Sequence, residues 1–348
     1  MTDAPVLEVE GLVKHFTAGR RIGAGGSTVH AVDDVSFVLR EGEMLGLVGE
    51  SGSGKTTLAN CVVRLLEPTS GAIRLRGRDI THLSRRELRP LRRDLHMVFQ
   101  DPYSSLNPRM TAGEIVAEPL RLHRLAGRKV REARVLETFD RVGLGPEHRF
   151  RYPHELSGGQ RQRVGLARSL ILQPSVLIAD EPVSALDVSV QASILNLLRD
   201  LQRDMGFSCL FITHDLATVE FLCDRIAVMY LGQLVEVASR DVIFRDPQHP
   251  YTQALLSAAV VPDPAEQRKR RRVVLEGDPP SPLAPPSGCR FRTRCPLRDL
   301  SAPACEELEP PLREVSPDHL VACHLATPGS RTPRIADTPA EAAPVTGG

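Results

Sequence analysis

The stretch GESGSGKTT, residues 49–57, constrains the fold of this chain more than any other feature. It matches the pattern G-x-x-x-x-G-K-S/T and lies between the apolar run MLGLV and the apolar-periodic stretch that follows it, which predicts a strand, a glycine-rich loop and a helix. Such a loop wraps backbone N–H groups around phosphates, and the helix N-terminus adds partial positive charge. We expect Lys55 to reach the β- and γ-phosphates of a nucleotide and the Thr56 hydroxyl to bind Mg²⁺.

The stretch SVLIADE, residues 175–181, supplies a second half for this site. Asp180 follows an apolar run that predicts a buried strand, so its carboxylate can hold Mg²⁺ beside the phosphate loop. Glu181 is then placed to polarise a water molecule that attacks the γ-phosphate. Together the two stretches indicate a site that binds and hydrolyses a nucleoside triphosphate.

Apolar runs elsewhere predict an α/β fold with a parallel core sheet. Short strand-like runs occur at 6–16, 35–48, 71–77, 175–180 and 209–214. A helical pattern at 189–206 separates the last two runs, and that strand–helix–strand order favours a parallel sheet. The charged, helical region from Thr111 to about Arg149 is expected to be an insertion, and the glycine-rich stretch 17–28 a flexible loop.

Composition argues against a nucleic-acid-binding protein. The net charge is +1, because 44 basic residues nearly cancel 43 acidic ones, whereas nucleic-acid-binding domains carry a basic excess. The basic runs at 85–94 and 268–272 are interpreted as a solvated helix face and a charged linker. The N-terminus lacks the pattern of a secretion signal, and no apolar run approaches the ~18 residues of a membrane span. We therefore expect a cytosolic protein.

Further motifs resemble those of ATP-binding cassette (ABC) proteins. The stretch ELSGGQRQR, residues 155–163, is similar to the signature of that family. VFQDP resembles the glutamine loop, SALD at 184–187 the D-loop, and ITHD the switch histidine. Phe16 matches the aromatic residue that stacks on adenine. The resemblance implies a cassette with a parallel core sheet, an antiparallel β subdomain, a helical subdomain at about 101–165 and a small C-terminal extension.

The resemblance also implies a mechanism in which two cassettes pack head to tail. Each ATP then lies between the phosphate loop of one cassette and the signature of the other, so this chain alone holds half of each site. Glu181 and His214 are expected to be catalytic, and Thr56, Gln100 and Asp180 to bind Mg²⁺. The residues expected to bind ATP are Phe16, Gly49, Glu50, Ser51, Gly52, Ser53, Gly54, Lys55, Thr56, Thr57, Gln100, Ser157, Gly158, Gly159, Gln160 and Asp187.

Longer stretches are similar to the ATPases of oligopeptide and dipeptide importers. They lie at 98–120, 151–160, 180–192 and 246–258 and in the ending GCRFRTRCP…C…HLVAC. This resemblance implies a peripheral protein on the cytoplasmic face of the membrane that powers import of a peptide or a related small solute. Its expected partners are a second, different cassette, two membrane permeases and an external substrate-binding protein. The domains would be a nucleotide-binding domain over 1–245, an extension over 246–326 and a disordered tail over 327–348.

Two other classes of protein fit the sequence less well than an importer ATPase does. Cassette ATPases of translation and DNA repair usually carry tandem cassettes or coiled-coil insertions, whereas this chain has one cassette and no heptad stretch. A stand-alone binding or regulatory module conflicts with the intact Glu181.

Four of the seven cysteines gather near the C-terminus, with the spacing C-x5-C-x9-C-x17-C. They are Cys289, Cys295, Cys305 and Cys323. The spacing does not fit the tight pairs of zinc ribbons, and a reducing compartment disfavours disulfides. A four-iron, four-sulfur (4Fe–4S) cluster takes about four such ligands, and the resemblance to peptide importers supports it. Zinc, with help from His319 or His324, and no metal at all remain alternatives.

Two further expectations concern the arginines beside these cysteines and the three cysteines elsewhere in the chain. Arg290, Arg292 and Arg294 are expected to stabilise the thiolates of this cluster by their charge. Cys61, Cys209 and Cys223 lie in apolar stretches and are expected to be buried small hydrophobic residues.

Overall fold

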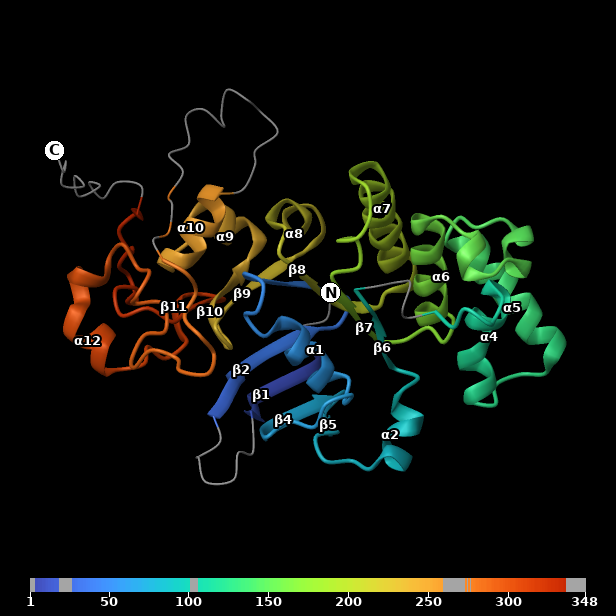
Figure 1. Ribbon diagram of the computed structural model, residues 1–348, viewed down its shortest axis with the longest axis horizontal. Coiled ribbons are helices and arrows are strands. Elements are labelled where there is room, and N and C mark those ends of the chain that lie inside the picture. Colours follow the sequence, from blue (N-terminus) through green and yellow to red (C-terminus); the bar gives the residue numbers. More distant parts are fainter. Residues whose placement is uncertain are drawn as a thin grey trace.

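A twisted sheet of eight strands runs through the middle of the molecule (Figure 1). The computed structural model describes residues 4–18, 27–100, 106–258, 273, 275 and 277–335. The strands follow the order β11-β12-β10-β9-β3-β8-β7-β6. Their bounds are β3 (Met44–Val48), β6 (Leu95–Val98), β7 (Val176–Asp180), β8 (Ser208–Thr213), β9 (Arg225–Tyr230), β10 (Gln233–Ser239), β11 (Arg313–Ser316) and β12 (His319–Val321).

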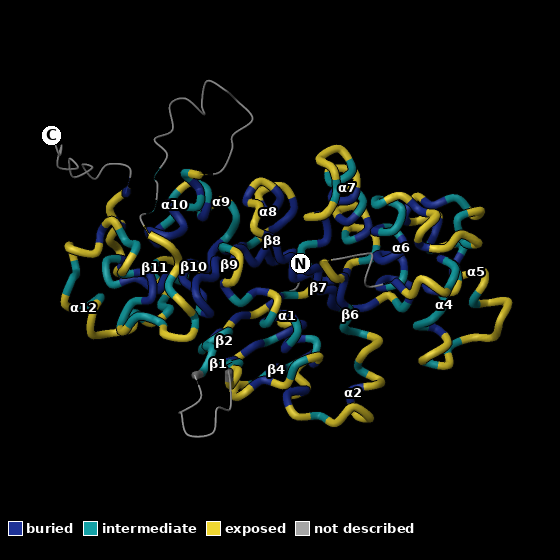
Figure 2. The backbone as a smooth tube through the Cα atoms, in the orientation of Figure 1, coloured by how far each residue is buried: buried dark blue, intermediate teal, exposed yellow. Residues whose placement is uncertain are grey.

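The centre of this sheet is parallel, which confirms the expected α/β class. β3 pairs with β8 and β9, and β7 pairs with β6 and β8, in each case in parallel. Every residue of β3, β7 and β8 is buried, as Figure 2 shows along the middle of the molecule. A sheet covered on both faces requires such continuous apolar strands. The carboxyl ends of β3, β7 and β8 lie at one edge, where the loops of the candidate site begin.

A second, antiparallel sheet of four strands has the order β2-β1-β4-β5. Its bounds are β1 (Pro5–Ala18), β2 (Ser27–Arg40), β4 (Ser70–Leu75) and β5 (Arg78–Asp79). The expected flexible loop at 17–28 is shorter than predicted, because Thr17 pairs with Thr28. Thr17 and Thr28 are β-branched, which suits a strand. Residues 19–26 lie outside the described part of the chain. Apolar side chains of this sheet pack with α1 (Lys55–Val62) against the large sheet.

The predicted helical insertion is present beside β6 (Figure 1). It contains α4 (Ala112–Leu122), α5 (Arg128–Arg141), the short 3-10 helices η1 (Pro146–Phe150) and η2 (Pro153–Glu155), and the start of α6 (Gly158–Leu170). Thr111 begins α4 with a capping box, in which its hydroxyl accepts from the Glu114 amide and the Glu114 carboxylate accepts from the Thr111 amide. Residues 101–105, also assigned to the insertion, lie outside the described residues.

The remaining helices cover the sheet and connect its strands. They are α2 (Arg85–Leu91), α7 (Val188–Met205), α8 (Leu216–Leu222), α9 (Arg240–Arg245) and α10 (Pro250–Ala258). The helix expected at 189–206 is α7, and it ends where Gly206 adopts a φ of 71°. No helix in the described part of the chain is both long and apolar enough to cross a membrane.

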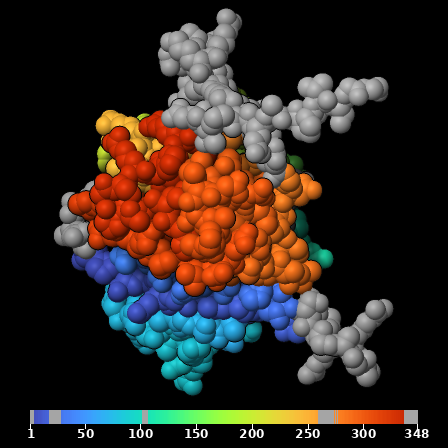
Figure 3. Space-filling model, turned by 90° about the vertical axis from the view of Figure 1, so that its left-hand side faces the viewer, coloured from blue at the N-terminus to red at the C-terminus, as the bar shows by residue number. Residues whose placement is uncertain are grey.

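The C-terminal extension is joined to the core sheet rather than appended to it. After α10 the chain forms η3 (Arg298–Ser301) and α12 (Ala302–Glu307), and then β11 and β12. β12 pairs with β10, with Val321 opposite Glu236. Figure 3 shows the extension covering one face of the molecule, against the N-terminal strands.

The expected disordered tail at 327–348 is partly corrected. Residues 327–335 are described, and Ile335 is buried. The amide of Thr332 donates to the side chain of Gln248 at 2.9 Å, and the amide of Ile335 donates to that of Gln253 at 2.9 Å. These bonds hold the segment against the start of α10. Residues 336–348 lie outside the described residues.

Candidate functional site

The predicted phosphate loop connects the buried strand β3 to the helix α1, as its sequence requires. Two glycines stand where no side chain fits. A Cβ atom on Gly49 would lie 2.1 Å from the Met229 carbonyl oxygen, and one on Gly54 would lie 2.1 Å from the Ala31 carbonyl oxygen. Gly54 also has a φ of 104°, which side chains rarely adopt. The loop therefore packs closely against β2 and β9.

Lys55 is held inside this loop. Its Nζ atom donates to the carbonyl oxygens of Gly49 at 2.8 Å and Glu50 at 2.9 Å, and the residue is buried. Burial lowers the pKa of Lys55, and the carboxylates of Glu181 and Asp180 oppose that shift. A lysine enclosed by a glycine loop at the start of a helix provides a site for the phosphates of a nucleotide.

Thr56 and Asp180 lie together at the carboxyl edge of the sheet. The Thr56 hydroxyl donates to the Asp180 carboxylate at 3.3 Å. Burial raises the pKa of Asp180, with the Glu181 charge adding to the rise, while Thr56 and Lys55 oppose it. A hydroxyl beside a carboxylate is the oxygen set that Mg²⁺ prefers, so the two residues fit the expected metal position.

Three expected residues from different strand ends meet at Glu181. Gln100 follows β6, Glu181 follows β7 and His214 follows β8. The Gln100 amide donates to Glu181 Oε2 at 2.9 Å, and His214 Nδ1 lies 3.2 Å from Glu181 Oε1. The Gln100 side chain, which was expected to bind Mg²⁺ with Thr56 and Asp180, therefore lies on Glu181. Among the described residues no hydrogen bond joins Gln100 to the Thr56–Asp180 pair.

Phe16 lies near the end of β1 and is 37% exposed, so it is not a core residue. The Lys14 ammonium lies 5.0 Å from the centroid of its ring. An exposed ring at this edge is free to stack on a flat ligand.

Beside Phe16 lies a group that the sequence did not reveal. His15 Nε2 lies 3.0 Å and His30 Nδ1 lies 3.2 Å from the two carboxylate oxygens of Asp33. Arg290 of the extension pairs with the same carboxylate. Pairing in the β1–β2 ladder, where His15 faces His30, is what brings the histidines together.

The signature begins α6, far from the phosphate loop in the chain fold (Figure 1). Ser157 caps this helix: its hydroxyl accepts from the Gln160 amide at 3.3 Å, and Gln160 Oε1 accepts from the Ser157 amide at 2.9 Å. A Cβ on Gly159 would lie 2.7 Å from Val190 Cγ1, so the first turn packs closely on α7. Asp187, just before α7, is exposed. No hydrogen bond joins these residues to the phosphate loop within the described chain.

The four C-terminal cysteines gather in the extension, as expected. The Cys289 amide donates to the Cys305 carbonyl oxygen at 2.9 Å. Burial raises the pKa of both the Cys289 and the Cys295 thiol to about 12, and the charges of the other cysteines add to the rise. Burial also raises the pKa of Cys305 and Cys323. The thiols are thus close enough to influence one another electrostatically.

The expectation for the three arginines is corrected for two of them. Arg294 forms a two-pronged ion pair with Glu50 of the phosphate loop, and Arg290 pairs with Asp33. Arg292 donates to the Ser287 carbonyl oxygen at 2.9 Å. The side chains of Arg290 and Arg294 therefore contact the cassette and not the thiols.

The two histidines proposed as additional zinc ligands have other partners. His319 is buried and its Nε2 atom lies 2.7 Å from Glu236 Oε1, while His324 Nε2 lies 2.9 Å from the Leu308 carbonyl oxygen. Zinc with sulfur ligands at about 2.3 Å needs sulfurs roughly 3.8 Å apart. Among described residues, the only group of ligand atoms lying within 4.8 Å of one another is His15, His30 and Asp33. The arrangement therefore disfavours a single zinc ion at the cysteines.

The other three cysteines are buried, as expected, and each is at most 1% exposed. Burial raises the pKa of Cys61 to about 11 and that of Cys209 and Cys223 well above the ordinary value.

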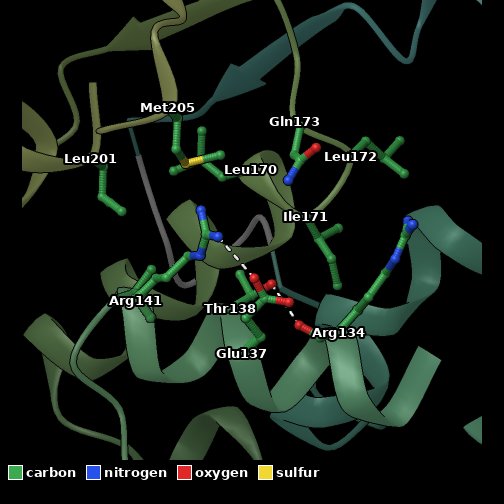
Figure 4. Close-up of a pocket in the computed structure, with 11 residues that line it drawn as sticks. Arg134, Glu137, Thr138, Arg141, Leu170, Ile171, Leu172, Gln173, Leu201 and Met205 are labelled. Atoms are coloured by element: carbon green, nitrogen blue, oxygen red, sulfur yellow. Dashed lines mark hydrogen bonds and ion pairs between the residues drawn. The ribbon is translucent and has the colours of Figure 1, made fainter. Parts of the chain in front are cut away.

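A separate pocket lies between α5, the end of α6 and α7 (Figure 4). Its polar side chains bond to their own helix: Arg141 donates to Glu137 at 2.8 Å, and the Thr138 hydroxyl donates to the Arg134 carbonyl oxygen at 2.7 Å. Leu201, Met205 and other apolar residues complete its wall. None of the expected nucleotide residues lines this pocket.

The strand–loop–helix, the buried lysine and the acidic pair at the end of β7 define a P-loop nucleotide-binding protein. Comparison with known families is more specific. The family profile of the ABC transporter matches residues 32–184, and that of the oligopeptide/dipeptide transporter C-terminal region matches residues 235–301. The chain belongs to the ATP-binding proteins of ABC transporters, and it is an ATPase subunit of this class.

Relatives extend over nearly the whole chain. The oligopeptide transport ATP-binding protein AppF of Bacillus subtilis is 48% identical over 92% of this chain and 97% of its own length. YkfD of the same organism, whose name also describes an oligopeptide transport ATP-binding protein, is 52% identical over 93% of this chain and 97% of its own length.

Solved structures agree on the fold. The ATP-binding cassette MJ0796, solved as a dimer bound to ADP and Pi, gives a TM-score of 0.60 at 31% identity. The match covers 67% of this chain and 98% of that one. CbiO1 of Clostridium perfringens gives 0.60 at 28% identity, covering 69% of this chain and 91% of that one.

Proposed function

We propose that this chain is the ATP-hydrolysing subunit of an importer for peptides or related small solutes. The observation that carries the proposal is the meeting of Gln100, Glu181 and His214 from three strand ends, next to the phosphate loop. These three residues are this chain's share of the residues that act on the attacking water. Relatives named for oligopeptide transport and the matching C-terminal region support peptides as the cargo. In this assignment residues 1–245 form the nucleotide-binding domain and 246–326 the extension.

In this proposal the phosphate loop and its neighbours bind ATP. Lys55 and the amides of the loop hold the β- and γ-phosphates, because their donors converge at the helix N-terminus. Phe16 stacks on the adenine with its exposed ring. Thr56 and Asp180 hold Mg²⁺, which offsets the negative charge of the phosphates when it is bound.

Glu181 orients and deprotonates the attacking water. His214 and Gln100 each contact one of its carboxylate oxygens, which keeps that carboxylate in a single orientation. His214 can leave Glu181 and contact the γ-phosphate, and Gln100 links the site to the helical insertion. Burial of Asp180 beside Glu181 concentrates the negative charge that attracts Mg²⁺.

The signature serves a second cassette. Ser157 and the amides of Gly158 and Gly159 lie at the start of a 13-residue helix, where backbone N–H groups favour an anion. They are not near the phosphate loop of their own chain, so we assign them to the γ-phosphate held by the partner. Val188, 81% exposed beside Asp187, then becomes part of the interface.

The proposed assembly contains a second, different cassette, two membrane permeases and an external substrate-binding protein, on the cytoplasmic face of the membrane. The helical insertion exposes large apolar side chains, namely Leu122, Val130 and Phe150, at 59%, 51% and 66%. Apolar residues that form a contiguous exposed patch mark interaction surfaces, and in the family that this chain resembles the helical insertion docks on the membrane partner. We assign this surface to the permeases.

Affinity purification from the native membrane tests this assignment. The tagged chain should bring down two polytopic permeases and a second cassette after mild detergent extraction. A Phe150→Asp variant, changed on the exposed apolar surface, should lose the permeases but keep ATP binding. Recovery of ribosomes or DNA in place of permeases would overturn the proposal in favour of a cassette of translation or repair.

The cysteine group is proposed to hold a 4Fe–4S cluster. Among the described residues no three of these thiols lie within 4.8 Å of one another, and a cluster of several iron and sulfur atoms spans a wider gap than one zinc ion does. Two of the four thiols are raised to a pKa of about 12, so a ligand that keeps them deprotonated must supply strong positive charge. When bound, the cluster would tie together three segments of the extension, namely the 289–295 loop, α12 and the residues after β12.

Anaerobic purification distinguishes the metals. The protein should be brown, absorb near about 400 nm and contain iron and acid-labile sulfide. Cys289→Ser should remove the absorption, whereas Cys61→Ser, changed at a buried cysteine outside the group, should retain it. Colourless protein with one equivalent of zinc, or with no metal, would contradict the cluster.

A further inference from the structure

The loop from Cys289 to Cys295 of the extension lies against the phosphate loop. It folds into consecutive turns, in which the Arg292 amide donates to the Cys289 carbonyl oxygen at 3.1 Å and the Arg294 amide to the Phe291 carbonyl oxygen at 3.0 Å. Figure 3 shows the extension in contact with the N-terminal strands over a broad face. Two side chains of this loop, Arg290 and Arg294, pair with Asp33 and Glu50 of the cassette.

Glu50 of the phosphate loop is held at each of its polar groups. Its two carboxylate oxygens accept from Arg294 at 2.8 and 3.2 Å, and its amide donates to the Tyr251 hydroxyl at 2.9 Å. Its carbonyl oxygen accepts from Lys55 at 2.9 Å. Arg294 and Tyr251 both belong to the extension, so the side chain and the amide of Glu50 are held from outside the cassette.

A second connection runs through Arg290. Its guanidinium donates to the Leu231 carbonyl oxygen at 2.7 Å and pairs with Asp33. The next residue in the turn, Gly232, donates its amide to the Ser53 carbonyl oxygen at 2.9 Å. The extension thus supports the phosphate loop at Glu50 directly and at Ser53 through the β9–β10 turn.

Phe291, between the two arginines, anchors the loop. It is 2% exposed, and its ring lies 5.3 Å from that of Tyr230, 5.5 Å from that of Tyr251 and 5.7 Å from that of His249. Aromatic rings at these separations attract one another and fix their relative positions. This anchor holds the loop, and with it Arg290 and Arg294, against the cassette.

The charge of Glu50 gives the ion pair a specific effect on ATP. An unpaired carboxylate beside a triphosphate would repel it, whereas a carboxylate bound on both oxygens by a guanidinium presents little net charge. The Arg294 side chain is only 8% exposed, so water screens this pair incompletely.

We propose that the Cys289–Cys295 loop positions the phosphate loop, with Arg294 neutralising Glu50, and that this support raises the affinity for ATP. The inference rests on the ATP site of the proposed function. Arg294 and Arg290 are positioning residues, since they act on the nucleotide through Glu50 and Ser53. By thermodynamic reciprocity, bound ATP must in turn stabilise the cysteine loop.

ATP binding by charge variants tests the proposal. Arg294→Gln should weaken ATP binding about tenfold, which corresponds to roughly 1.4 kcal/mol. It should leave adenosine binding unchanged, because adenosine carries no phosphate. The Arg294→Gln, Glu50→Gln double variant should recover most of the ATP affinity. Arg292→Gln removes a charge of the same loop and should bind ATP like the parent protein. Within the described residues, the side-chain hydrogen bonds of Arg292 go to Ser287.

Three results would overturn the proposal: equal ATP affinity in Arg294→Gln and the parent, equal losses in Arg294→Gln and Arg292→Gln, or a double variant as weak as the single. If the parent protein bound no ATP, the proposed function itself would fail. Failure of the proposed function is thereby distinguished from failure of the coupling, in which the parent protein still binds ATP.

Hydrogen exchange of the unaltered protein gives a readout that needs no variant. ATP should slow amide exchange over residues 289–295, while the β11–β12 hairpin serves as an internal reference. Exchange of 289–295 that ATP leaves unchanged would contradict the coupling, even if Arg294→Gln failed to fold.

Discussion

Glu181 has a backbone conformation that few residues adopt. Its φ is 44°, in the left-handed region, and its amide donates to the Ile212 carbonyl oxygen at 2.9 Å. Non-glycine residues in this region are strained by about 1–3 kcal/mol and cluster at functional sites. The strain turns the carboxylate away from the strand direction and toward Gln100 and His214. Asp180, one residue earlier and still in β7, stays buried beside Thr56.

Replacing Glu181 by Gln should separate binding from hydrolysis. The amide keeps the size and the hydrogen-bonding capacity of the side chain but cannot accept a proton from water. ATP affinity should remain near that of the parent, while turnover with the partner cassette falls by about two orders of magnitude or more. Phosphate release and equilibrium ATP binding would measure the two effects. Near-normal turnover would exclude Glu181 as the catalytic base.

Two glycines of the phosphate loop allow a matched comparison. Gly54→Ala should weaken ATP binding at least about tenfold, because the new Cβ would lie 2.1 Å from the Ala31 backbone and must displace the loop. Gly52 has a φ of 80° but nothing within 4 Å of such a Cβ, so Gly52→Ala adds backbone strain alone and should have a smaller effect. Equal losses would show that backbone strain, and not the close approach to β2, limits the loop. ATP titration of both variants decides this.

At the level of elements, β10 joins the cassette to its extension. Its Glu236 is completely buried and accepts from the amides of Gln248 and His249 at 2.6 and 2.9 Å, while its Oε1 atom also lies 2.7 Å from His319 Nε2. One carboxylate thus holds the segment before α10 and the start of β12. A buried carboxylate is tolerated only with such partners. The contact explains why the extension packs as part of the sheet.

His249, just before α10, makes folding sensitive to acid. Burial lowers its pKa from 6.5 to about 3, so the folded protein excludes a proton that the unfolded chain binds below about pH 6.5. The unfolded state therefore carries more protons between these values, and stability falls as pH falls through that window. From pH 7 to pH 5 this one group should cost about 2 kcal/mol.

Chemical denaturation at pH 7 and pH 5 would measure the contribution of His249. His249→Asn, which keeps an acceptor for the Tyr251 amide but cannot titrate, should lose less stability on acidification than the parent protein. His82→Asn, at an exposed histidine, should behave like the parent. An unchanged pH dependence in His249→Asn would rule out this histidine as the source.

At the scale of the whole molecule, the two halves of the ATP site face different partners. The phosphate loop and the three residues at Glu181 lie at the edge of the sheet, while the signature starts α6 beside α7. The helical insertion and the extension lie at opposite ends of the molecule, on either side of this edge (Figure 1). In the proposed function ATP joins two cassettes, and in the proposed coupling the extension supports the phosphate loop through Arg294 and Glu50.

The prediction for the whole molecule concerns the association of this chain with its partner cassette. In the Glu181→Gln background, ATP should drive association with the partner cassette, as measured by analytical ultracentrifugation. Adding Ser157→Arg should abolish the association, because a bulky side chain would occupy the surface at the start of α6. ATP should still bind the phosphate loop of that chain. Glu132→Lys, on the exposed face of α5, should pair normally, and a Ser157→Arg protein that also pairs would refute the composite site.

Much of the nucleotide site was predictable from the sequence because its chemistry is encoded locally. Backbone amides, a lysine and a threonine within nine residues create a phosphate site wherever a strand leads into a helix. The buried runs of β7 and β8 predicted parallel strands, so Asp180, Glu181 and His214 could be placed at one edge. A group of four thiols was predictable for a similar reason, because the four cysteines lie within 35 residues of one another in the sequence.

Only the tertiary structure decided what the extension does to the cassette. The pairing of β12 with β10, the packed segment 327–335 and the ion pairs of Arg290 and Arg294 join residues more than 75 positions apart, and no local pattern encodes such distances. Sequence reasoning assigned the arginines to the neighbouring thiols because nearness along the chain was its only guide. The structure assigns two of them to Asp33 and Glu50, because the consecutive turns of the loop and the buried ring of Phe291 hold these two side chains against the cassette.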